Sequence, residues 1–219
     1  MFTTAVYDLD GIIIDSEPLW RKAMIAGFSQ VGLQLTEDDC RRTTGMRLSE
    51  VVQHWYKKSS WKSKSVIEVE ANIVDILCDF IQTEGRGMDG MLYSLEFFKK
   101  RNINLGIATS SSHKILHTVL DALQIKSEFL HLQSAENLKF GKPHPEVYLC
   151  CAEAMRVNAL ECLAIEDSLN GIVAAKAAGM KVVAVPEKHN FDDQRFSLAD
   201  LKISSLNDLS DHVIHAINF

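Results

Sequence analysis

The sequence predicts an α/β protein, in which a doubly wound parallel β-sheet carries an all-helical domain inserted after its first strand. From residue 85 onward, short apolar runs typical of strands alternate with amphipathic stretches typical of helices, and this rhythm yields a parallel sheet with helices on both faces. Residues 17–84 show helical periodicity without a strand signal, and one more strand-like run precedes them. We therefore expect residues 1–16 and 85–219 to form an α/β core and residues 17–84 to form a helical domain.

The first strand and the helical block have distinct local signals. Residues 3–7 are β-branched, aromatic or small, which favours a short buried strand. Pro18 suits the first turn of a helix, where a missing backbone N–H costs nothing. Further helix starts are expected at Thr36, Ser49 and Ser65, because each hydroxyl can cap the helix that follows. The block should thus contain about four helices, whose apolar faces pack on one another.

Helices and strands then alternate as far as residue 185. Apolar residues recur at helical spacing, and continuous apolar runs lie between them. The expected helices lie at about 91–98, 115–123, 148–155 and 168–178, and the expected strands at 105–108, 130–132, 163–165 and 181–185. The helical block therefore interrupts the first crossover of the sheet. An inserted domain there would lie over the carboxyl ends of the strands, where open α/β sheets bind ligands.

Composition excludes several classes of protein. The 219 residues carry a net charge of −6, which argues against nucleic-acid partners and against binding to an anionic membrane. Five cysteines without paired spacing argue against a disulfide framework. No signal peptide and no apolar run of membrane-spanning length is evident. We expect a cytoplasmic protein, and a small acidic domain with its own core is expected to be a monomer.

Two carboxylates follow the first predicted strand. Asp8 and Asp10 stand one residue apart, and Gly11 then allows a sharp turn. Two acids at the end of a buried strand are unfavourable unless a cation neutralises them, and oxygen ligands favour a hard ion such as Mg²⁺. An Asp-rich turn before the next helix accounts for the same residues. This stretch alone leaves the turn and the metal site equally open.

Three later segments place more polar groups directly after strands. Thr109 and Ser110 precede a helix, where a hydroxyl and free N–H groups form a phosphate cradle, although a plain serine cap explains them too. Lys142 lies in a Gly-Lys-Pro-x-Pro stretch whose prolines stiffen the loop; the alternative is a solvated surface lysine. Glu166 and Asp167 end a strand, and Asp167 either caps the next helix or completes an oxygen cage for Mg²⁺. Together these groups supply a carboxylate nucleophile, an acid/base, anion donors and a magnesium site, which is the equipment of phosphoryl transfer.

The order and spacing of these motifs resemble the haloacid dehalogenase (HAD) superfamily of phosphatases over essentially the whole chain. The motifs are Asp-x-Asp-Gly, the post-strand Thr, Gly-Lys-Pro-x-Pro and Glu-Asp-Ser-x-x-Gly. The helical block resembles the α-helical cap of that superfamily. Other stretches are similar to bacterial phosphatases that act on 2-deoxyglucose 6-phosphate and hexitol phosphates. These stretches are residues 15–20, 44–47, 55–56, 134–136 and 196–200.

The resemblance implies a role for each motif residue. Asp8 would attack phosphorus and become an aspartyl phosphate, and Asp10 would protonate the leaving alkoxide and later deprotonate water. The side chains of Asp8 and Asp167, with the backbone carbonyl of Asp10, would hold Mg²⁺.

The remaining residues of the motifs would serve the transferring group. Thr109, the amide of Ser110 and Lys142 would stabilise the phosphoryl oxygens. Glu166 would either bind a magnesium-bound water or orient Lys142.

The resemblance also indicates a small phosphorylated metabolite as substrate and the cap as the source of specificity. Glu17, Trp20 and Arg47 are the candidates there, although core packing explains Trp20 and a solvated charge explains Arg47. A β-phosphoglucomutase-like phosphotransferase is the nearest alternative, but that branch has a histidine where this chain has Trp20. A dehalogenase would need neither Asp10 nor Mg²⁺. A non-catalytic sugar-phosphate-binding protein is the alternative from another class, and it would not require every catalytic position to be filled.

Overall fold

The computed structural model describes residues 2–43 and 46–217, which fold as two compact units. One unit joins the residues up to Asp15 to those from Gly87 onward, and the other runs Ser16–Arg86. The first unit contains the sheet, and the second is helical.

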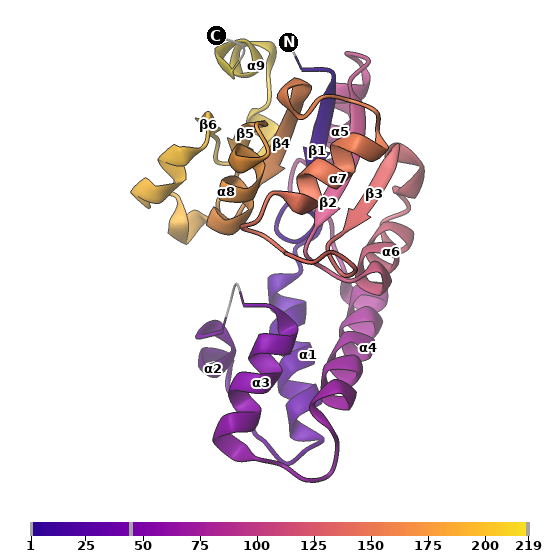
Figure 1. Ribbon diagram of the computed structural model, residues 1–219, viewed down its shortest axis with the longest axis vertical. Coiled ribbons are helices and arrows are strands. Elements are labelled where there is room, and N and C mark those ends of the chain that lie inside the picture. The colour runs from indigo at the N-terminus through magenta and orange to yellow at the C-terminus, as the bar shows by residue number, and fades with distance from the viewer. Residues whose placement is uncertain (1, 44–45, 218–219) are drawn as a thin grey trace. The chain divides into compact units, whose positions relative to one another are not determined.

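A parallel sheet forms the centre of the first unit (Figure 1). In the described part of the chain it has six strands in the order β3-β2-β1-β4-β5-β6. Their bounds are β1 Thr4–Tyr7, β2 Asn104–Thr109, β3 His131–Ser134, β4 Cys162–Glu166, β5 Lys181–Ala184 and β6 Leu201–Lys202. The predicted doubly wound parallel class is confirmed. Strand β6 was not predicted, because a two-residue strand is too short to show a periodicity.

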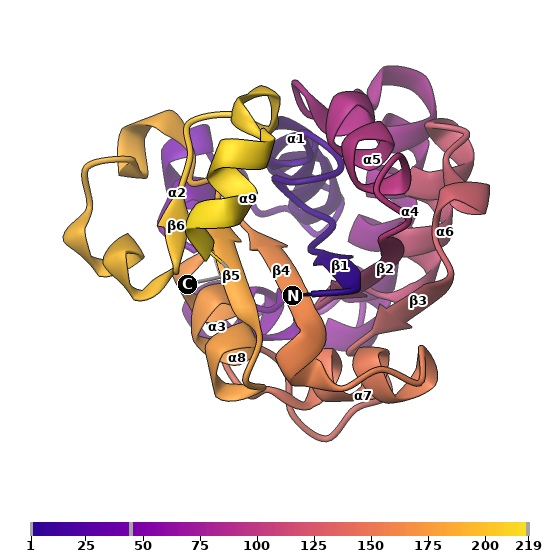
Figure 2. The same cartoon turned by 90° about the horizontal axis from the view of Figure 1, so that it is seen from above.

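Helices cover both faces of this sheet (Figure 2). The helices of this unit are α5 Met91–Lys99, α6 His113–Ala122, α7 Glu146–Ala154, α8 Leu169–Ala177 and α9 Asp211–Ile217. Helices α7 and α8 pack on the face that Val6 and Ala164 present. The neighbouring Tyr7 points to the other face, where its ring meets Phe98 and Phe129 edge to face, as the alternation of side chains along a strand requires. Both faces are thus apolar, and polar side chains gather at the strand ends.

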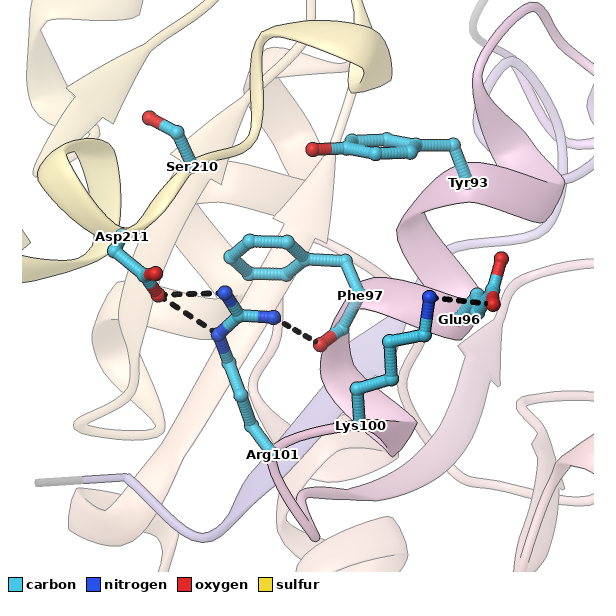
Figure 3. A pocket seen from close by; sticks show the side chains of 7 residues that line it. All are labelled: Tyr93, Glu96, Phe97, Lys100, Arg101, Ser210 and Asp211. Atoms are coloured by element: carbon cyan, nitrogen blue, oxygen red, sulfur yellow. Dashed lines mark hydrogen bonds and ion pairs between the residues drawn. The ribbon is translucent and has the colours of Figure 1, made fainter.

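Helix α9 is joined to α5 by a polar contact that Figure 3 shows in close-up. Arg101, just after α5, donates two hydrogen bonds of 2.8 and 2.7 Å to Asp211 Oδ1 and lies 3.6 Å from the ring centroid of Phe97. The Tyr93 hydroxyl donates to the carbonyl of Leu209 at 2.7 Å. The side chains of Tyr93, Phe97, Arg101 and Asp211 help to line a surface pocket of about 340 Å³. The charged groups of this pocket pair with one another. We therefore interpret these contacts between α5 and the segment that begins at Leu209 as a C-terminal joint, which holds that segment in place.

Helices α1 to α4 form the second unit. Their bounds are α1 Glu17–Ser29, α2 Glu37–Arg41, α3 Leu48–Ser59 and α4 Val66–Glu84. Helix α4 packs along α1 and α3, and Phe28 of α1 meets Trp61 edge to face. The apolar faces of these helices therefore do pack on one another, as their spacing predicts.

Two of the three expected helix caps lie where the sequence places them. Thr36 and Ser65 each form a capping box with the acid three residues on. The third expectation was wrong, because α3 is capped at Arg47 and not at Ser49. The Glu50 carboxylate accepts the backbone N–H of Arg47 at 3.2 Å, so this acid sets the start of the helix and Ser49 is not needed as a cap.

The described residues also bear on two expectations from composition. None of their helices has the length and apolarity needed to cross a membrane. All five cysteines are free, and all except Cys150 are buried.

Candidate active site

The loop after β1 is held by backbone hydrogen bonds, both to β4 and within the loop. The N–H of Asp8 donates to the carbonyl of Ile165 at 2.9 Å, and the N–H of Gly11 donates to Ile14 at 2.9 Å. Gly11 has φ +74°, which only glycine adopts freely. A Cβ on Gly11 would lie 2.2 Å from Oδ2 of Asp167. The glycine is thus required both by the turn and by the close approach of a second acid.

The register of the sheet brings the sequence motifs to one edge. Tyr7 is level with Ile107 on β2 and with Ile165 on β4. Asp8 follows Tyr7 directly, and Thr109 and Asp167 each come two residues after the partner of Tyr7. Three residues far apart in the sequence therefore reach the carboxyl edge of adjacent strands, where ligands bind in such sheets.

Lys142 links two carboxylates at this edge. Its Nζ lies 2.7 Å from Oδ1 of Asp8 and 2.6 Å from Oε1 of Glu166. The lysine side chain is 6% exposed and that of Glu166 is fully buried. A buried charge needs a partner of opposite sign, so the alternative of a solvated surface lysine does not hold.

Glu166 is hydrogen-bonded through both of its carboxylate oxygens. Oε1 accepts from Lys142 and, at 2.8 Å, from the Tyr148 hydroxyl. Oε2 accepts from the N–H groups of Asp167 and Ser168, both at 3.1 Å, and from the Ser168 hydroxyl at 3.0 Å. A Cβ on Gly171 would lie 1.7 Å from Oε1, so this glycine leaves the room that the carboxylate fills. Of the two roles expected for Glu166, these contacts favour orienting Lys142.

Burial of these acids alters their proton affinity. Burial raises the pKa of Asp8 to about 7, against the attraction of Lys142. Burial also raises the pKa of Asp167 well above its usual range, and the charges of Glu166 and Asp8 add to the effect. Although burial disfavours its ammonium form, the charges of Asp8 and Glu166 raise the pKa of Lys142. The lysine therefore stays charged, and the site holds more carboxyl groups than one lysine can neutralise.

The acidic residues fit a divalent cation. Carboxylate oxygens of Asp8, Glu166 and Asp167 lie within 4.8 Å of one another. Only oxygen is offered, which is the donor set that Mg²⁺ prefers. A cation would offset both the burial and the repulsion between acids that raise the pKa of Asp8 and Asp167. This group contains Asp8 and Asp167 of the predicted ligands. Asp10 was expected to contribute only its backbone carbonyl, and its side chain is not part of the group.

The phosphate-binding candidates lie at the end of β2. Thr109 is 1% exposed, and its hydroxyl accepts the N–H of Ser111 at 3.0 Å. Ser110 between them is exposed. The Ser112 side chain accepts from the N–H of Ile115 and so caps α6. The serine cap therefore exists, but it is Ser112, which leaves Thr109 and Ser110 at the edge of the sheet.

Asp10 is half-buried, and its side chain points to the segment that follows β2. Its Oδ2 accepts a hydrogen bond of 2.6 Å from the hydroxyl of Ser111. The second aspartate thus contacts the segment after β2, while Asp8 contacts Lys142.

The cap candidates belong to the second unit. Glu17 accepts a hydrogen bond of 2.6 Å from Arg21 one turn further along α1, and Trp20 is half-buried on the same helix. Arg47 is exposed. Residues 44 and 45, from the stretch 44–47 singled out in the sequence, lie outside the described residues.

Two residues of the edge were missed by sequence reasoning. Tyr148 was assigned to the apolar face of a helix, which is correct for its ring, but its hydroxyl reaches Glu166. Ser111 was one of a run of serines, and nothing in that run marks which hydroxyl meets Asp10. The signal that could have found Tyr148 is the polar atom of a tyrosine in a buried stripe, since such a hydroxyl needs a partner.

Comparison with known sequences identifies the family. Residues 5–185 match the family described as haloacid dehalogenase-like hydrolases. The chain belongs to this family. Hexitol phosphatase B of Escherichia coli (strain K12) is 36% identical over 207 residues, covering 94% of this chain and 93% of that protein. The resemblance inferred from the motifs is therefore confirmed, and this HAD-like hydrolase falls in the class of phosphoric monoester hydrolases.

Solved structures agree with this HAD-like fold. CbbY from Rhodobacter sphaeroides, in complex with phosphate, superposes with a TM-score of 0.88 at 20% identity, over 100% of both chains. β-Phosphoglucomutase from Clostridium difficile superposes with a TM-score of 0.82 at 26% identity, over 100% of this chain and 98% of that one. The same architecture thus occurs in proteins with different names, so fold alone does not decide the substrate.

Proposed function

We propose that this HAD-like hydrolase is a Mg²⁺-dependent phosphatase of small sugar phosphates, and of hexitol phosphates in particular. One observation carries the proposal: Asp8, Lys142, Glu166 and Asp167 meet at the carboxyl edge of the sheet, and more acids gather there than the lysine can neutralise. Such a cluster is costly for folding alone, which supports a role in binding a cation and a phosphate.

In this proposal Asp8 is the nucleophile. One of its carboxylate oxygens forms a bond to phosphorus while the bond from phosphorus to the sugar oxygen breaks, which leaves an aspartyl phosphate. Asp10 gives its proton to the departing sugar oxygen. It then takes a proton from the water that attacks phosphorus, and Asp8 is regenerated with release of inorganic phosphate.

Other residues of the edge would stabilise the transferring group. Lys142, held by Glu166 and Tyr148, would place its ammonium beside the phosphoryl oxygens, and Thr109 with the N–H of Ser110 would donate hydrogen bonds to them. Asp8 and Asp167, with the backbone carbonyl of Asp10, would hold Mg²⁺. When bound, the ion would supply positive charge that offsets the repulsion of the carboxylate and the phosphate.

The substrate class rests on the hexitol phosphatase B relative and on the motifs similar to sugar-phosphate phosphatases. We propose that the helical unit acts as the cap and that Glu17, Trp20 and Arg47 contribute to selectivity. A phosphorylated polyol offers hydroxyl groups and one dianionic phosphate, which suits carboxylate, aromatic and guanidinium partners.

Phosphate release from a panel of substrates tests this function. The panel comprises hexitol phosphates, hexose 6-phosphates, 2-deoxyglucose 6-phosphate and nucleotides, each with Mg²⁺ and with EDTA. We expect Mg²⁺-dependent release, fastest for the sugar and hexitol phosphates. Asp8→Asn should abolish phosphate release. Asp15→Asn, which removes an exposed acid just after the loop that follows β1, should retain it. Equal turnover with EDTA, or retained activity in Asp8→Asn, would contradict the proposed mechanism.

The same preparation distinguishes a phosphatase from a mutase. A β-phosphoglucomutase-like enzyme would interconvert hexose 1-phosphate and hexose 6-phosphate without net release of phosphate. We expect release to exceed isomerisation for every hexose phosphate tested. Binding of sugar phosphates without turnover of either kind would instead indicate a non-catalytic protein.

A further inference from the structure

Ser111 contacts the proposed acid/base directly. Its hydroxyl lies 2.6 Å from Oδ2 of Asp10, across 101 positions of sequence. The phosphate-binding and metal-binding assignments use other residues, so this contact has no role in them. A hydrogen bond to a carboxylate is among the stronger side-chain contacts, and it fixes the orientation of the acceptor.

The backbone of Ser111 is itself held on both sides. Its N–H donates to the Thr109 hydroxyl at 3.0 Å, and its carbonyl accepts from the hydroxyl of Ser134 at 2.6 Å. Ser134 is 1% exposed and ends β3, and its oxygen also accepts the N–H of Glu136 at 3.0 Å. The Glu136 carboxylate in turn accepts the N–H of His113 at the start of α6. The Ser111 hydroxyl therefore projects from a rigid position set by two strands and a helix.

We propose that Ser111 is a positioning residue for Asp10, and that it assigns separate tasks to the two oxygens of that carboxyl group. Oδ2 accepts the Ser111 hydrogen bond, and Oδ1 carries the proton that is exchanged with the substrate. Both the ionised and the neutral carboxyl group can accept through Oδ2, so the same contact serves Asp10 as acid and as base. The inference rests on the proposed function, since it presumes that Asp10 transfers a proton.

The proton balance shows which step depends on this contact. In the first step, the Asp8–phosphorus bond forms, the phosphorus–oxygen bond of the substrate breaks, and Oδ1 of Asp10 gives its proton to the leaving oxygen. A sugar alkoxide is strongly basic and needs that proton. A p-nitrophenolate ion is weakly basic and leaves without it. Loss of positioning should therefore slow alkyl phosphates far more than p-nitrophenyl phosphate.

The experiment compares kcat/KM for a hexitol phosphate and for p-nitrophenyl phosphate in the full chain with Mg²⁺. We expect Ser111→Ala to lower kcat/KM for the hexitol phosphate by at least about tenfold, the effect of one hydrogen bond to a charged group, and that for p-nitrophenyl phosphate by less than about twofold. Ser111→Thr keeps the hydroxyl and should restore most of the loss. Ser112→Ala removes the next hydroxyl, which caps α6 and does not contact Asp10 in the described residues, and should leave the ratio of the two substrates unchanged.

A double-mutant cycle shows whether Ser111 acts through Asp10. In an Asp10→Asn background, Ser111→Ala should cause no further loss, because the group that it positions can no longer transfer a proton. Equal losses for both substrates in Ser111→Ala, failure of Ser111→Thr to restore them, or additive losses with Asp10→Asn would each overturn the inference. The proposed function fails separately, if the wild-type protein releases no phosphate or if Asp10→Asn leaves the ratio of the two substrates unchanged.

Discussion

Gly171→Ala sets two physical effects of opposite sign against each other. Helix propensity alone favours alanine over glycine within a helix by about 1 kcal/mol, so a position without other constraints would become more stable. Here the new Cβ would lie 1.7 Å from Oε1 of Glu166, whereas ordinary van der Waals contact begins at 3.4 Å. Oε1 must move away by about the difference between these two distances, or α8 must move away from the sheet.

The magnitude follows from what Oε1 loses. Its hydrogen bonds from Lys142 and Tyr148, of 2.6 and 2.8 Å, cannot survive such a displacement. A hydrogen bond to a charged group contributes about 1.5–3 kcal/mol. After subtraction of the gain in helix propensity, we expect the free energy of unfolding to fall by about 2–5 kcal/mol, which lowers Tm by at least about 4 °C for a chain of this size.

The assay is thermal unfolding followed by circular dichroism, together with phosphate release. Because Lys142 loses one of its two carboxylate partners, kcat should fall as well. Asn170→Ala is the matched control, since Asn170 is exposed on the same helix, and its Tm should change little. A Gly171→Ala protein that melts at or above the wild-type temperature would refute the close packing of Glu166 against α8.

Three further predictions concern pH, the metal and the C-terminal joint. Burial raises the pKa of Asp8 from 3.8 to about 7, so between these pH values the folded state keeps a proton that the unfolded state has lost. The free energy of unfolding of the metal-free protein, measured in urea, should therefore fall as pH rises from about 4 to about 7. Asp8→Asn should flatten that profile. Gly11→Ala, whose Cβ would lie 2.2 Å from Asp167 Oδ2, should raise the Mg²⁺ concentration for half-maximal activity by at least about tenfold, while Gly32→Ala, with φ +81° and open space around its Cβ, should not. Arg101→Ala should lower stability by about 1 kcal/mol through its contacts with Asp211 and Phe97, and an equal loss in Lys100→Ala, whose partner Glu96 lies on the same helix, would contradict the role of the joint.

The residues at the carboxyl edge of the sheet could be predicted from the sequence, because most of them end a strand or directly follow one in the chain. Asp8, Thr109 and Asp167 follow strands whose register is fixed by apolar pairing, so finding the strands also locates the motifs. Lys142 was also a candidate from the sequence, since the prolines beside it restrict the backbone of its loop. These features follow from local composition together with the rule that the carboxyl ends of parallel strands meet at one edge of the sheet, where ligands bind.

The contacts that depend on side-chain direction were not accessible in the same way. Whether Glu166 orients Lys142 or binds a water depends on five hydrogen bonds that only the folded structure reveals. The hydroxyl that meets Asp10 could have been any of three adjacent serines. The start of α3 was misplaced because a carboxylate in the first turn can set a helix start without a hydroxyl at the cap.

The central claim, that Asp8 carries the phosphoryl group during turnover, can be measured directly. The enzyme is quenched with acid during steady-state hydrolysis of a hexitol phosphate, and its peptides are mapped by mass spectrometry. We predict one phosphoryl group on the peptide that contains Asp8, and none after the substrate is exhausted or in Asp8→Asn. Rapid phosphate release from a protein that is never phosphorylated at Asp8 would contradict the account.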